Sequence, residues 1–151
     1  MPELSILSQQ LDALLYEETN SIANLSNAAA LIFQTMKDLN WAGFYLFNPE
    51  TDELDLGPFQ GKVACMHIKN GNGVCGTAFK TQSVQRVANV HEFPGHIACD
   101  SDSNAELVIP LFKDTKPIGV LDIDSPTLAR FTNEDEQQLV EFTQVLLRHL
   151  D

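Results

Sequence analysis

Both ends of the chain carry apolar residues at helical spacing. Over residues 4–15, leucines recur every three or four positions, which predicts a short amphipathic helix. A second apolar stripe predicts a longer helix over residues 21–39, with Asn40 as a suitable residue to end it. Near the C-terminus, Thr132 is a favourable N-cap and acidic residues follow it, so we expect a closing helix over residues 132–149.

The middle of the chain has the shorter period of β-strands. The aromatic-rich residues 41–47 repeat every two positions and end at an Asn-Pro turn, which predicts a strand. Shorter segments follow: strands at 54–56 and 62–68 around a turn at Gly57-Pro58, a helix at 74–80, and strands at 84–87, 106–112 and 117–123. Residues 89–104 are predicted to be a loop, and the polar residues 113–116 a hairpin between the last two strands.

The order of these elements is helices, an antiparallel run of strands and a closing helix. This order favours an α+β fold, with a central antiparallel sheet flanked by the N- and C-terminal helices, over a βαβ fold. The 151 residues contain no repeat or linker, so we predict one domain over 1–151. Its parts are helices in 1–39, the sheet and site loops in 40–131, and the last helix in 132–149.

The charge of the chain excludes several classes of partner. Nine Lys and Arg residues stand against 21 Asp and Glu residues, a net charge of −12. Such a chain is repelled by nucleic-acid phosphates and by anionic lipid surfaces, so we expect neither as a partner. No apolar run approaches the roughly 20 residues that cross a bilayer, and the first residues do not resemble a signal peptide. We therefore expect a cytoplasmic protein.

Three cysteines, Cys65, Cys75 and Cys99, are candidate reactive groups. Their odd number argues against a structural disulfide framework, and their spacing does not fit a C-x-x-C motif. Cys75 lies near the start of a predicted helix, where a thiol pKa is lowered, which makes it the better thiolate candidate. Cys99 is the more accessible one, with His96 near enough to activate it and acids after it that oppose ionisation. Three buried, inert cysteines are the alternative interpretation.

Several acidic and aromatic residues share faces of the predicted strands. Asp122 and Asp124 are two positions apart, so they project to one side, and Glu106 in the neighbouring strand can point there too. Because like charges this close disfavour double ionisation, we expect one carboxyl to hold a proton near neutral pH. A solvated acidic face is the alternative. Trp41 and Tyr45 also share a face, either as core or as an aromatic wall of a site.

Two further motifs carry weaker signals. Residues 71–76 fit G-x-G-x-x-G, but no parallel strand follows and the only acid at a suitable distance, Glu92, lies in a loop. The backbone N–H groups at that helix start can still hold a small anion such as a carboxylate. His91 and His96 are spaced five apart with Pro94 between them, unlike a zinc-protease motif. We expect no bound metal.

Five segments, in this order, resemble the free methionine-(R)-sulfoxide reductases, which are enzymes built on a single GAF domain. The segments are NWAGFY at 40–45, LGPFQG at 56–61, GVCG at 73–76, GHIACD at 95–100 and GVLDIDS at 119–125. The likeness runs from about residue 40 to the C-terminus and includes all three cysteines.

The resemblance implies a GAF fold and the reduction of free L-methionine (R)-sulfoxide to L-methionine. It also implies thioredoxin as the electron donor and no bound cofactor. In the family, the cysteine matching Cys99 attacks the sulfoxide sulfur and the one matching Cys65 resolves the sulfenic acid as a disulfide. The cysteine matching Cys75 is a second candidate for disulfide exchange. The resemblance therefore replaces Cys75 by Cys99 as the expected nucleophile.

The chemistry implied by the resemblance also gives roles to the acids and aromatics. A protonated carboxyl among Glu106, Asp122 and Asp124 would protonate the sulfoxide oxygen, and the others would pair with the substrate ammonium. Trp41 and Tyr45 would wall the S-methyl group. Domains of this family commonly pair, so we expect a homodimer. A GAF sensor that binds a small ligand without turnover is the alternative, which has no need of three such cysteines beside an acidic cluster.

Overall fold

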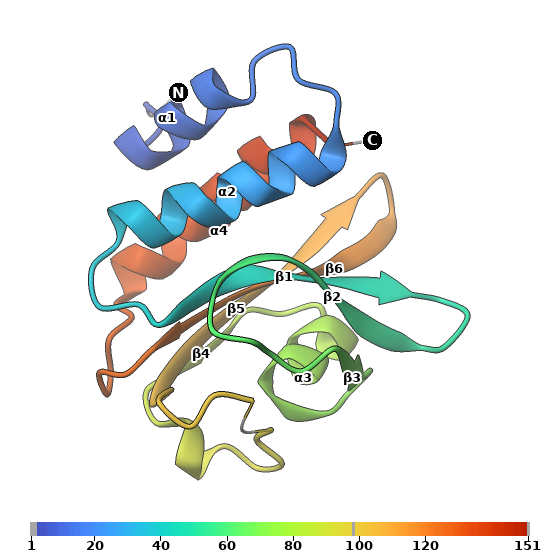
Figure 1. Cartoon of the computed structure of the whole chain (residues 1–151), viewed down its shortest axis with the longest axis vertical. Helices are drawn as coiled ribbons and strands as arrows, with labels where there is room; N and C mark the ends of the chain where they lie inside the picture. The colour runs from blue at the N-terminus through green and yellow to red at the C-terminus, as the bar shows by residue number, and fades with distance from the viewer. Residues whose placement is uncertain (1–2, 98, 151) are drawn as a thin grey trace.

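The computed structural model describes residues 3–97 and 99–150, in which a six-stranded antiparallel sheet has helices on both faces (Figure 1). The strands are β1 (Trp41–Asn48), β2 (Glu53–Gly61), β3 (His67–Lys69), β4 (Gln85–Val87), β5 (Ala105–Lys113) and β6 (Lys116–Ser125). The helices are α1 (Ile6–Leu14), α2 (Ser21–Thr35), α3 (Gly73–Thr81) and α4 (Asn133–Arg148), with a 3₁₀ turn at Val90–Glu92. The strand order β3-β2-β1-β6-β5-β4 puts β1 and β6 at the centre. The predicted α+β class is confirmed.

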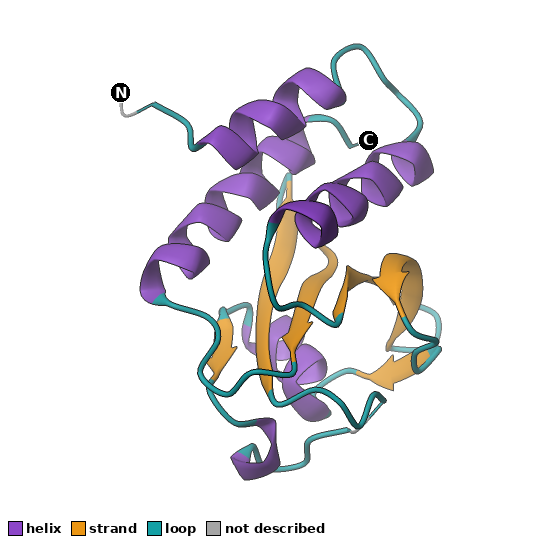
Figure 2. Ribbon diagram, turned by 60° about the vertical axis from the view of Figure 1, so that its left-hand side comes forward, coloured by secondary structure: helices purple, strands orange, loops and turns teal. Residues whose placement is uncertain are grey.

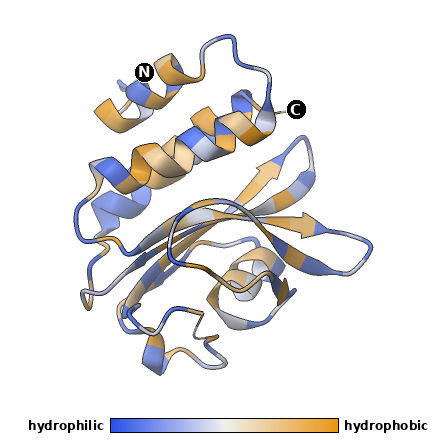
Figure 3. Ribbon diagram, viewed as in Figure 1, coloured by the Kyte–Doolittle hydropathy of each residue, from blue (hydrophilic) through white to orange (hydrophobic). Residues whose placement is uncertain are grey.

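One face of the sheet is covered by α2 and α4, and α1 packs on these two helices, so the three helices lie together in both ribbon views (Figures 1 and 2). Alternate strand residues such as Phe44 and Leu121 face these helices and are fully buried against side chains such as Ile32 and Phe142. Figure 3 shows the central strands rich in hydrophobic residues and the hairpin ends hydrophilic. The period-two strands and the helical stripes thus meet in the larger of two cores.

The opposite face of the sheet packs against α3 and the segments around it (Figure 1). Strand pairing decides which residues share this face. Trp41 lies opposite Asp124, Gly43 opposite Asp122, and Glu106 opposite Asp124 on the other side of β6. Because directly paired residues project to the same side, the acids and aromatics singled out in the sequence meet on one surface.

The helix ends differ in how well the sequence predicted them. Thr132 and Asp135 form a reciprocal capping box at the start of α4, as the N-cap prediction required. The predicted end of the second helix at residue 39 is wrong, because α2 ends at Thr35 with Met36 as its C-cap. Asp38 then takes a positive φ of 61°, which is not a helical conformation, and the chain turns toward β1 although apolar residues continue at helical spacing.

The turn predicted at Gly57-Pro58 is also wrong, since β2 runs straight through it. Between the pairs Tyr45–Leu56 and Gly43–Phe59, β2 has two residues where β1 has one. These two are the predicted turn residues, and they form a β-bulge. A bulge tolerates a proline because it interrupts the ladder of backbone hydrogen bonds.

The strand predicted over 62–68 is mostly a loop. Only His67–Lys69 pairs with β2, and residues 62–66, which we call the Cys65 loop, leave the sheet. Gly61 has a positive φ of 132°, a conformation that favours glycine, and it turns the chain at the end of β2. Val63 and Met66 are exposed, so two of the apolar residues that suggested a strand here are not buried.

The remaining predicted segments have their expected character. Residues 113–116 are the hairpin between β5 and β6, with Asp114 and Thr115 both at positive φ as in a two-residue turn. The predicted loop over 89–104 contains one short 3₁₀ turn, Val90–Glu92. No helix among the described residues is both long and apolar enough to cross a membrane.

Candidate active site

A small cavity of about 40 Å³ lies on the second face of the sheet. It is bounded by the strands, by the start of α3 and by the loops before β3 and β5. Every predicted site residue except Cys65 lines it: Trp41, Tyr45, Cys75, Cys99, Glu106, Asp122 and Asp124. The structure therefore brings together residues that are far apart in the sequence.

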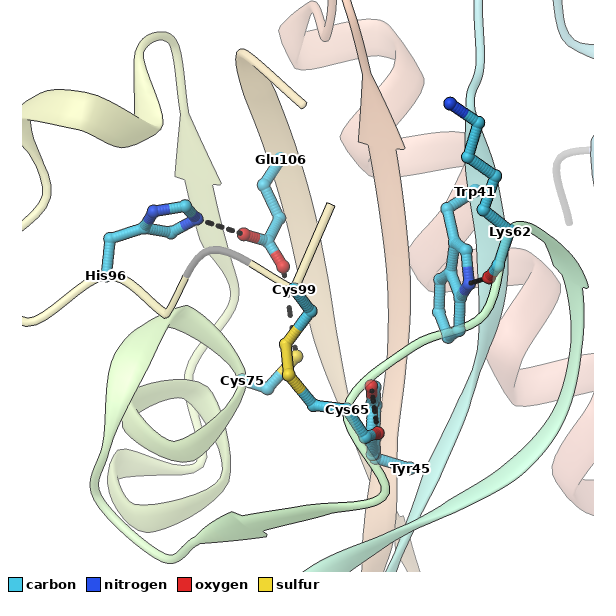
Figure 4. Close-up of a disulfide and its surroundings, with 8 residues drawn as sticks. All are labelled: Trp41, Tyr45, Lys62, Cys65, Cys75, His96, Cys99 and Glu106. Carbon is cyan, nitrogen blue, oxygen red and sulfur yellow. Dashed lines mark hydrogen bonds and ion pairs between the residues drawn. A yellow bond between two sulfur atoms is a disulfide. The ribbon is translucent and has the colours of Figure 1, made fainter. Parts of the chain in front are cut away.

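Cys65 and Cys99 are joined by a disulfide at the edge of this cavity (Figure 4). Their Cα atoms are 5.4 Å apart although 34 positions separate them in the chain. Cys65 lies in the loop after β2, and Cys99 in the long loop before β5. Each of the two loops thus contributes one sulfur atom to the disulfide at the edge of the cavity.

Cys75 lies in the first turn of α3 and is buried. Its thiol donates a hydrogen bond to Glu106 Oε2 at 3.8 Å. Burial raises the pKa of the Cys75 thiol well above its ordinary value, and the carboxylates of Asp122 and Glu106 raise it further. The expectation that the helix start lowers this pKa is wrong, because desolvation and negative neighbours outweigh the helix dipole. Cys75 is a neutral hydrogen-bond donor in this site.

Three buried carboxyl groups form the floor of the cavity. Glu106, Asp122 and Asp124 are between 5% and 9% exposed, so the alternative of a solvated acidic face is wrong. Burial raises the pKa of all three, and the charge of Asp122 raises the pKa of the other two further. These three carboxyls therefore keep protons at pH values at which isolated carboxyls would lose them. Asp122 Oδ1 is buried and has no hydrogen-bond partner among the described residues.

His96 extends this polar group and does not contact the Cys99 sulfur, contrary to the sequence-based expectation (Figure 4). Its Nε2 lies 3.9 Å from Glu106 Oε1. Burial lowers the pKa of His96, which favours the neutral imidazole. His91 is instead hydrogen-bonded to Asn104 Oδ1 at 2.9 Å, so the two histidines serve different neighbours.

The aromatic side of the cavity is a stack of three rings. Trp41 packs on Tyr45 with ring centroids 5.8 Å apart and on Phe59 with centroids 5.2 Å apart. Phe59 was not singled out in the sequence, although it lies in a family-like segment and its strand pairing with Gly43 explains its position. A Cβ at position 43 would lie 2.3 Å from the Phe59 Cβ, so glycine is required for this stack.

The Cys99 loop has its own anchors. Asn40 donates hydrogen bonds to Asp100 Oδ2 at 3.0 Å and to Ser103 Oγ at 2.9 Å. Lys62 pairs with Asp102 at 2.6 Å and so links the Cys65 loop to the Cys99 loop across the solvent-exposed side. Asn40 and Ser103 are further site residues that sequence reasoning missed, because each acts through a residue distant in the chain.

The start of α3 offers hydrogen-bond donors to the cavity. Asn72, the N-cap residue, makes no side-chain capping hydrogen bond, and Gly73 and Val74 line the cavity. Their backbone N–H groups belong to the first turn, where no intrahelical partner exists. The small-anion site expected from the glycine-rich segment stays a prediction, which this placement of Gly73 and Val74 supports.

Donor atoms that lie close enough to share a metal ion occur in two places among the described residues. They are Cys75, Glu106 and Asp122 in the cavity, and Glu53, Asp55 and His67 at the edge of the sheet. Cys65 and Cys99 are bonded to each other, so these two cysteines are not free metal ligands in this structure. The absence of a bound metal stays a prediction.

The chain matches known proteins over nearly its whole length. The model of the GAF domain family matches residues 10–149. A free methionine-R-sulfoxide reductase of Escherichia coli is 54% identical over 133 residues, which cover 88% of this chain and 79% of the relative. A free methionine-R-sulfoxide reductase of Saccharomyces cerevisiae is 44% identical over 135 residues, covering 85% and 75% of the two chains.

A solved structure shows the same arrangement of elements. The free methionine-R-sulfoxide reductase of Neisseria meningitidis, solved in complex with its substrate, superposes with a TM-score of 0.92 at 39% identity. The match covers 99% of this chain and 94% of that one. The resemblance inferred from five short segments is confirmed: the chain has the GAF fold and belongs to the family of the free methionine-R-sulfoxide reductases.

Proposed function

We propose that this protein reduces free L-methionine (R)-sulfoxide to L-methionine with Cys99 as the nucleophile. One observation carries the proposal: a buried carboxyl group with an unpartnered oxygen, Asp122 Oδ1, shares a cavity with one sulfur of a disulfide. The sulfurs supply two electrons, and the carboxyls supply a proton and a partner for a cation. Free methionine sulfoxide needs all three.

The sulfur chemistry follows from the disulfide pair. In the reduced protein, the Cys99 thiolate attacks the sulfoxide sulfur, the oxygen is transferred to Cys99, and methionine leaves. Cys99 is then a sulfenic acid, and the Cys65 thiol condenses with it to form the disulfide and release water. Thioredoxin, a dithiol, restores the two thiols by exchange.

The carboxyl cluster activates and orients the substrate. A sulfoxide oxygen is a poor leaving group until it is protonated, so a carboxyl that holds its proton near neutral pH is the required acid. Glu106 and Asp124 are the candidates for this acid, because burial and the charge of Asp122 raise the pKa of both carboxyls. The substrate ammonium then pairs with Asp122, whose free oxygen would otherwise stay unsatisfied.

The remaining parts of the substrate have matching surfaces. The backbone N–H groups at the start of α3 donate hydrogen bonds to the substrate carboxylate. Trp41 and Tyr45, supported by Phe59, wall the S-methyl group. With the ammonium and carboxylate fixed, contact of the S-methyl group with this wall would distinguish the R epimer from the S epimer.

Cys75 is a second candidate for resolving the sulfenic acid. Its buried thiol and raised pKa make it a slower partner in disulfide exchange than a thiol on a loop. Our proposal therefore gives the resolving role first to Cys65. No bound cofactor and a cytoplasmic location belong to the same proposal.

A homodimer is also part of the proposal. Large apolar side chains are exposed on α1, on its connection to α2 and at the start of α2: Ile6 is 74%, Leu14 48%, Tyr16 73% and Ile22 71% exposed. These residues lie on the helical side of the sheet, away from the cavity (Figure 1). A second copy can cover them and leave the site open.

The reaction is tested by following NADPH oxidation through thioredoxin reductase and thioredoxin. We expect turnover of free L-methionine (R)-sulfoxide, and none of the S epimer or of a methionine sulfoxide peptide. No turnover of any of the three, with the thiols confirmed as reduced, would contradict the proposal and favour a ligand-binding sensor.

The cysteine roles are tested by single substitutions. We expect Cys99→Ser to abolish turnover, because it removes the nucleophile. Cys65→Ser is expected to form about one methionine per site and then stall, because the sulfenic acid is formed but not resolved. The methionine formed in a single turnover is measured by chromatography.

Continued turnover by Cys65→Ser that disappears in a Cys65→Ser/Cys75→Ser double variant would assign the resolving role to Cys75. Steady-state turnover by Cys99→Ser would refute Cys99 as the nucleophile.

A further inference from the structure

The Cys65 loop has few apolar contacts to hold it in place. Val63 is 89% exposed and Met66 70% exposed, so these side chains do not anchor it. The disulfide ties the loop to Cys99 in the oxidised protein, but this bond is absent when the sulfenic acid forms. Some other interaction must then keep Cys65 close to Cys99.

The polar ends of the two cavity aromatics make such interactions. Tyr45 Oη donates a hydrogen bond to the backbone oxygen of Cys65 at 2.9 Å, and Trp41 Nε1 donates one to the backbone oxygen of Lys62 at 3.1 Å (Figure 4). A third bond, from the Leu56 N–H to the Met66 oxygen at 2.9 Å, fixes the end of the loop to β2.

The two aromatic donors are themselves held firmly. Both belong to the central strand β1, and Trp41 and Tyr45 are only 3% and 2% exposed. Their rings stack on each other, and Trp41 also stacks on Phe59, which restricts the rotation of both side chains. Gly61 brings the chain close to Trp41, since a Cβ at position 61 would lie 2.7 Å from Trp41 Cδ1.

We propose that Tyr45 and Trp41 are positioning residues for the resolving cysteine, which hold the Cys65 loop by its backbone oxygens while Cys99 is a sulfenic acid. The proposal rests on the proposed function and extends it: the same two side chains that wall the substrate on their ring faces present their donors to the Cys65 loop. The hydroxyl of Tyr45 is the more direct of the two, because it bonds to Cys65 itself.

The step that these hydrogen bonds serve is a condensation. The Cys65 sulfur forms a bond to the Cys99 sulfur, the S–O bond of the sulfenic acid breaks, and the hydroxyl leaves as water after taking up a proton. Restricting the loop raises the effective concentration of the Cys65 thiol at Cys99. Burial and nearby carboxylates raise the pKa of Tyr45 above its ordinary value, so the hydroxyl keeps its proton and donates at any physiological pH.

The test is Tyr45→Phe, which keeps the ring and removes only the hydroxyl. In a single turnover of the reduced protein, we expect Tyr45→Phe to slow disulfide formation about tenfold more than it slows methionine formation, the effect of losing about one hydrogen bond. Rapid quenching and mass spectrometry follow both products, and dimedone traps the accumulated Cys99 sulfenic acid.

A second experiment uses hydrogen peroxide in place of the sulfoxide, so that it does not depend on substrate binding. Peroxide oxidises the Cys99 thiolate directly to the sulfenic acid: the sulfur takes one hydroxyl of the peroxide, and the other leaves as hydroxide, which takes up a proton from the solvent to form water. The same tenfold slowing of the disulfide is expected there. If the protein reduces no sulfoxide, the peroxide arm still decides whether Tyr45 positions Cys65.

Two further variants complete the test. Trp41→Phe keeps an aromatic ring without the N–H donor, and we expect disulfide formation to slow in the same direction. It also serves if Tyr45→Phe does not fold. Tyr16→Phe removes the hydroxyl of a tyrosine that is 73% exposed, and no change is expected. Wild-type disulfide formation in Tyr45→Phe, or equal slowing of methionine and disulfide formation, would overturn the proposal.

Discussion

The three carboxyl side chains of the site oppose the stability of the fold at neutral pH. Their pKa values are raised in the folded protein, so the native state binds more protons than the unfolded state between the two sets of pKa values. Stability therefore falls as the pH rises above about 4, where unfolded carboxyls ionise. The penalty is absent at lower pH, where both states are protonated.

Asp124→Asn tests this sign. The amide keeps the shape of the side chain and removes one charge from the cluster, so we expect the midpoint of thermal unfolding to rise at pH 8, by about 2–4 °C for each kcal/mol relieved. The gain should shrink toward pH 4. Activity should fall by about a hundredfold or more, because the variant loses a candidate proton donor.

Glu50→Gln, in an exposed turn, is the matched control for Asp124→Asn and is expected to change neither quantity. A lower unfolding midpoint for Asp124→Asn at pH 8 would show that the Asp124 carboxylate does not destabilise the fold, and near-normal activity would show that Asp124 is not the proton donor.

For single residues, the sequence predicted which side chains share a face of a strand better than it predicted the burial and the charges around each side chain. Asp122 and Asp124 share a face because they are two positions apart, which needs no tertiary information. The pKa of Cys75 needs it: the helix start is visible in the sequence, but the burial and the facing acids come from other elements. The local effect was therefore predicted and the larger, non-local one was not.

Among the elements, α4 and the site occupy opposite faces of the sheet. The capping box of α4 joins Thr132 and Asp135, and Arg130 pairs with Asp135 at 3.0 Å. The sequence could predict this start of the helix because the residues that form it lie within a few positions of one another in the chain. The bulge at Gly57-Pro58 and the loop at 62–66 could not, since the pairing with β1 and the turn at Gly61 decide them.

The opposite placement predicts that α4 can be weakened without loss of activity. Thr132→Ala removes the capping oxygen, and we expect the free energy of unfolding to fall by about 1 kcal/mol. Urea denaturation measures the change, with Thr19→Ala at an exposed position as the control. Turnover at a temperature well below unfolding should stay within twofold of wild type, and a large loss would show that α4 and the site are coupled.

At the scale of the whole molecule, the sheet separates stability from chemistry. The larger core lies under α1, α2 and α4, whereas the second face combines a smaller core with buried acids and sulfurs. The alternation of the central strands revealed both faces in the sequence. The meeting of Cys65 and Cys99 was implied only by the family resemblance, because nothing local relates two loops 34 residues apart.

The exposed apolar side chains at the N-terminal end give a prediction about assembly. We expect light scattering after size-exclusion chromatography to report twice the chain mass of 16.7 kDa. A Tyr16→Glu/Ile22→Glu variant should halve this mass, because each charge would be buried unpaired in the interface. Its turnover should remain, since the site lies on the other side of the sheet. A wild-type mass of one chain would contradict the dimer.

The size of the cavity sets an order in which the sulfoxide and the reductant can react with the protein. In the disulfide form it offers about 40 Å³, room for a few water molecules and far less than an amino acid needs. A methionine sulfoxide molecule therefore has no place in the protein until a reductant has opened the bond between the two loops. We therefore expect that an excess of sulfoxide does not inhibit the oxidised protein: the sulfoxide concentration determines how often the disulfide forms, and the supply of reductant determines how soon it is reduced.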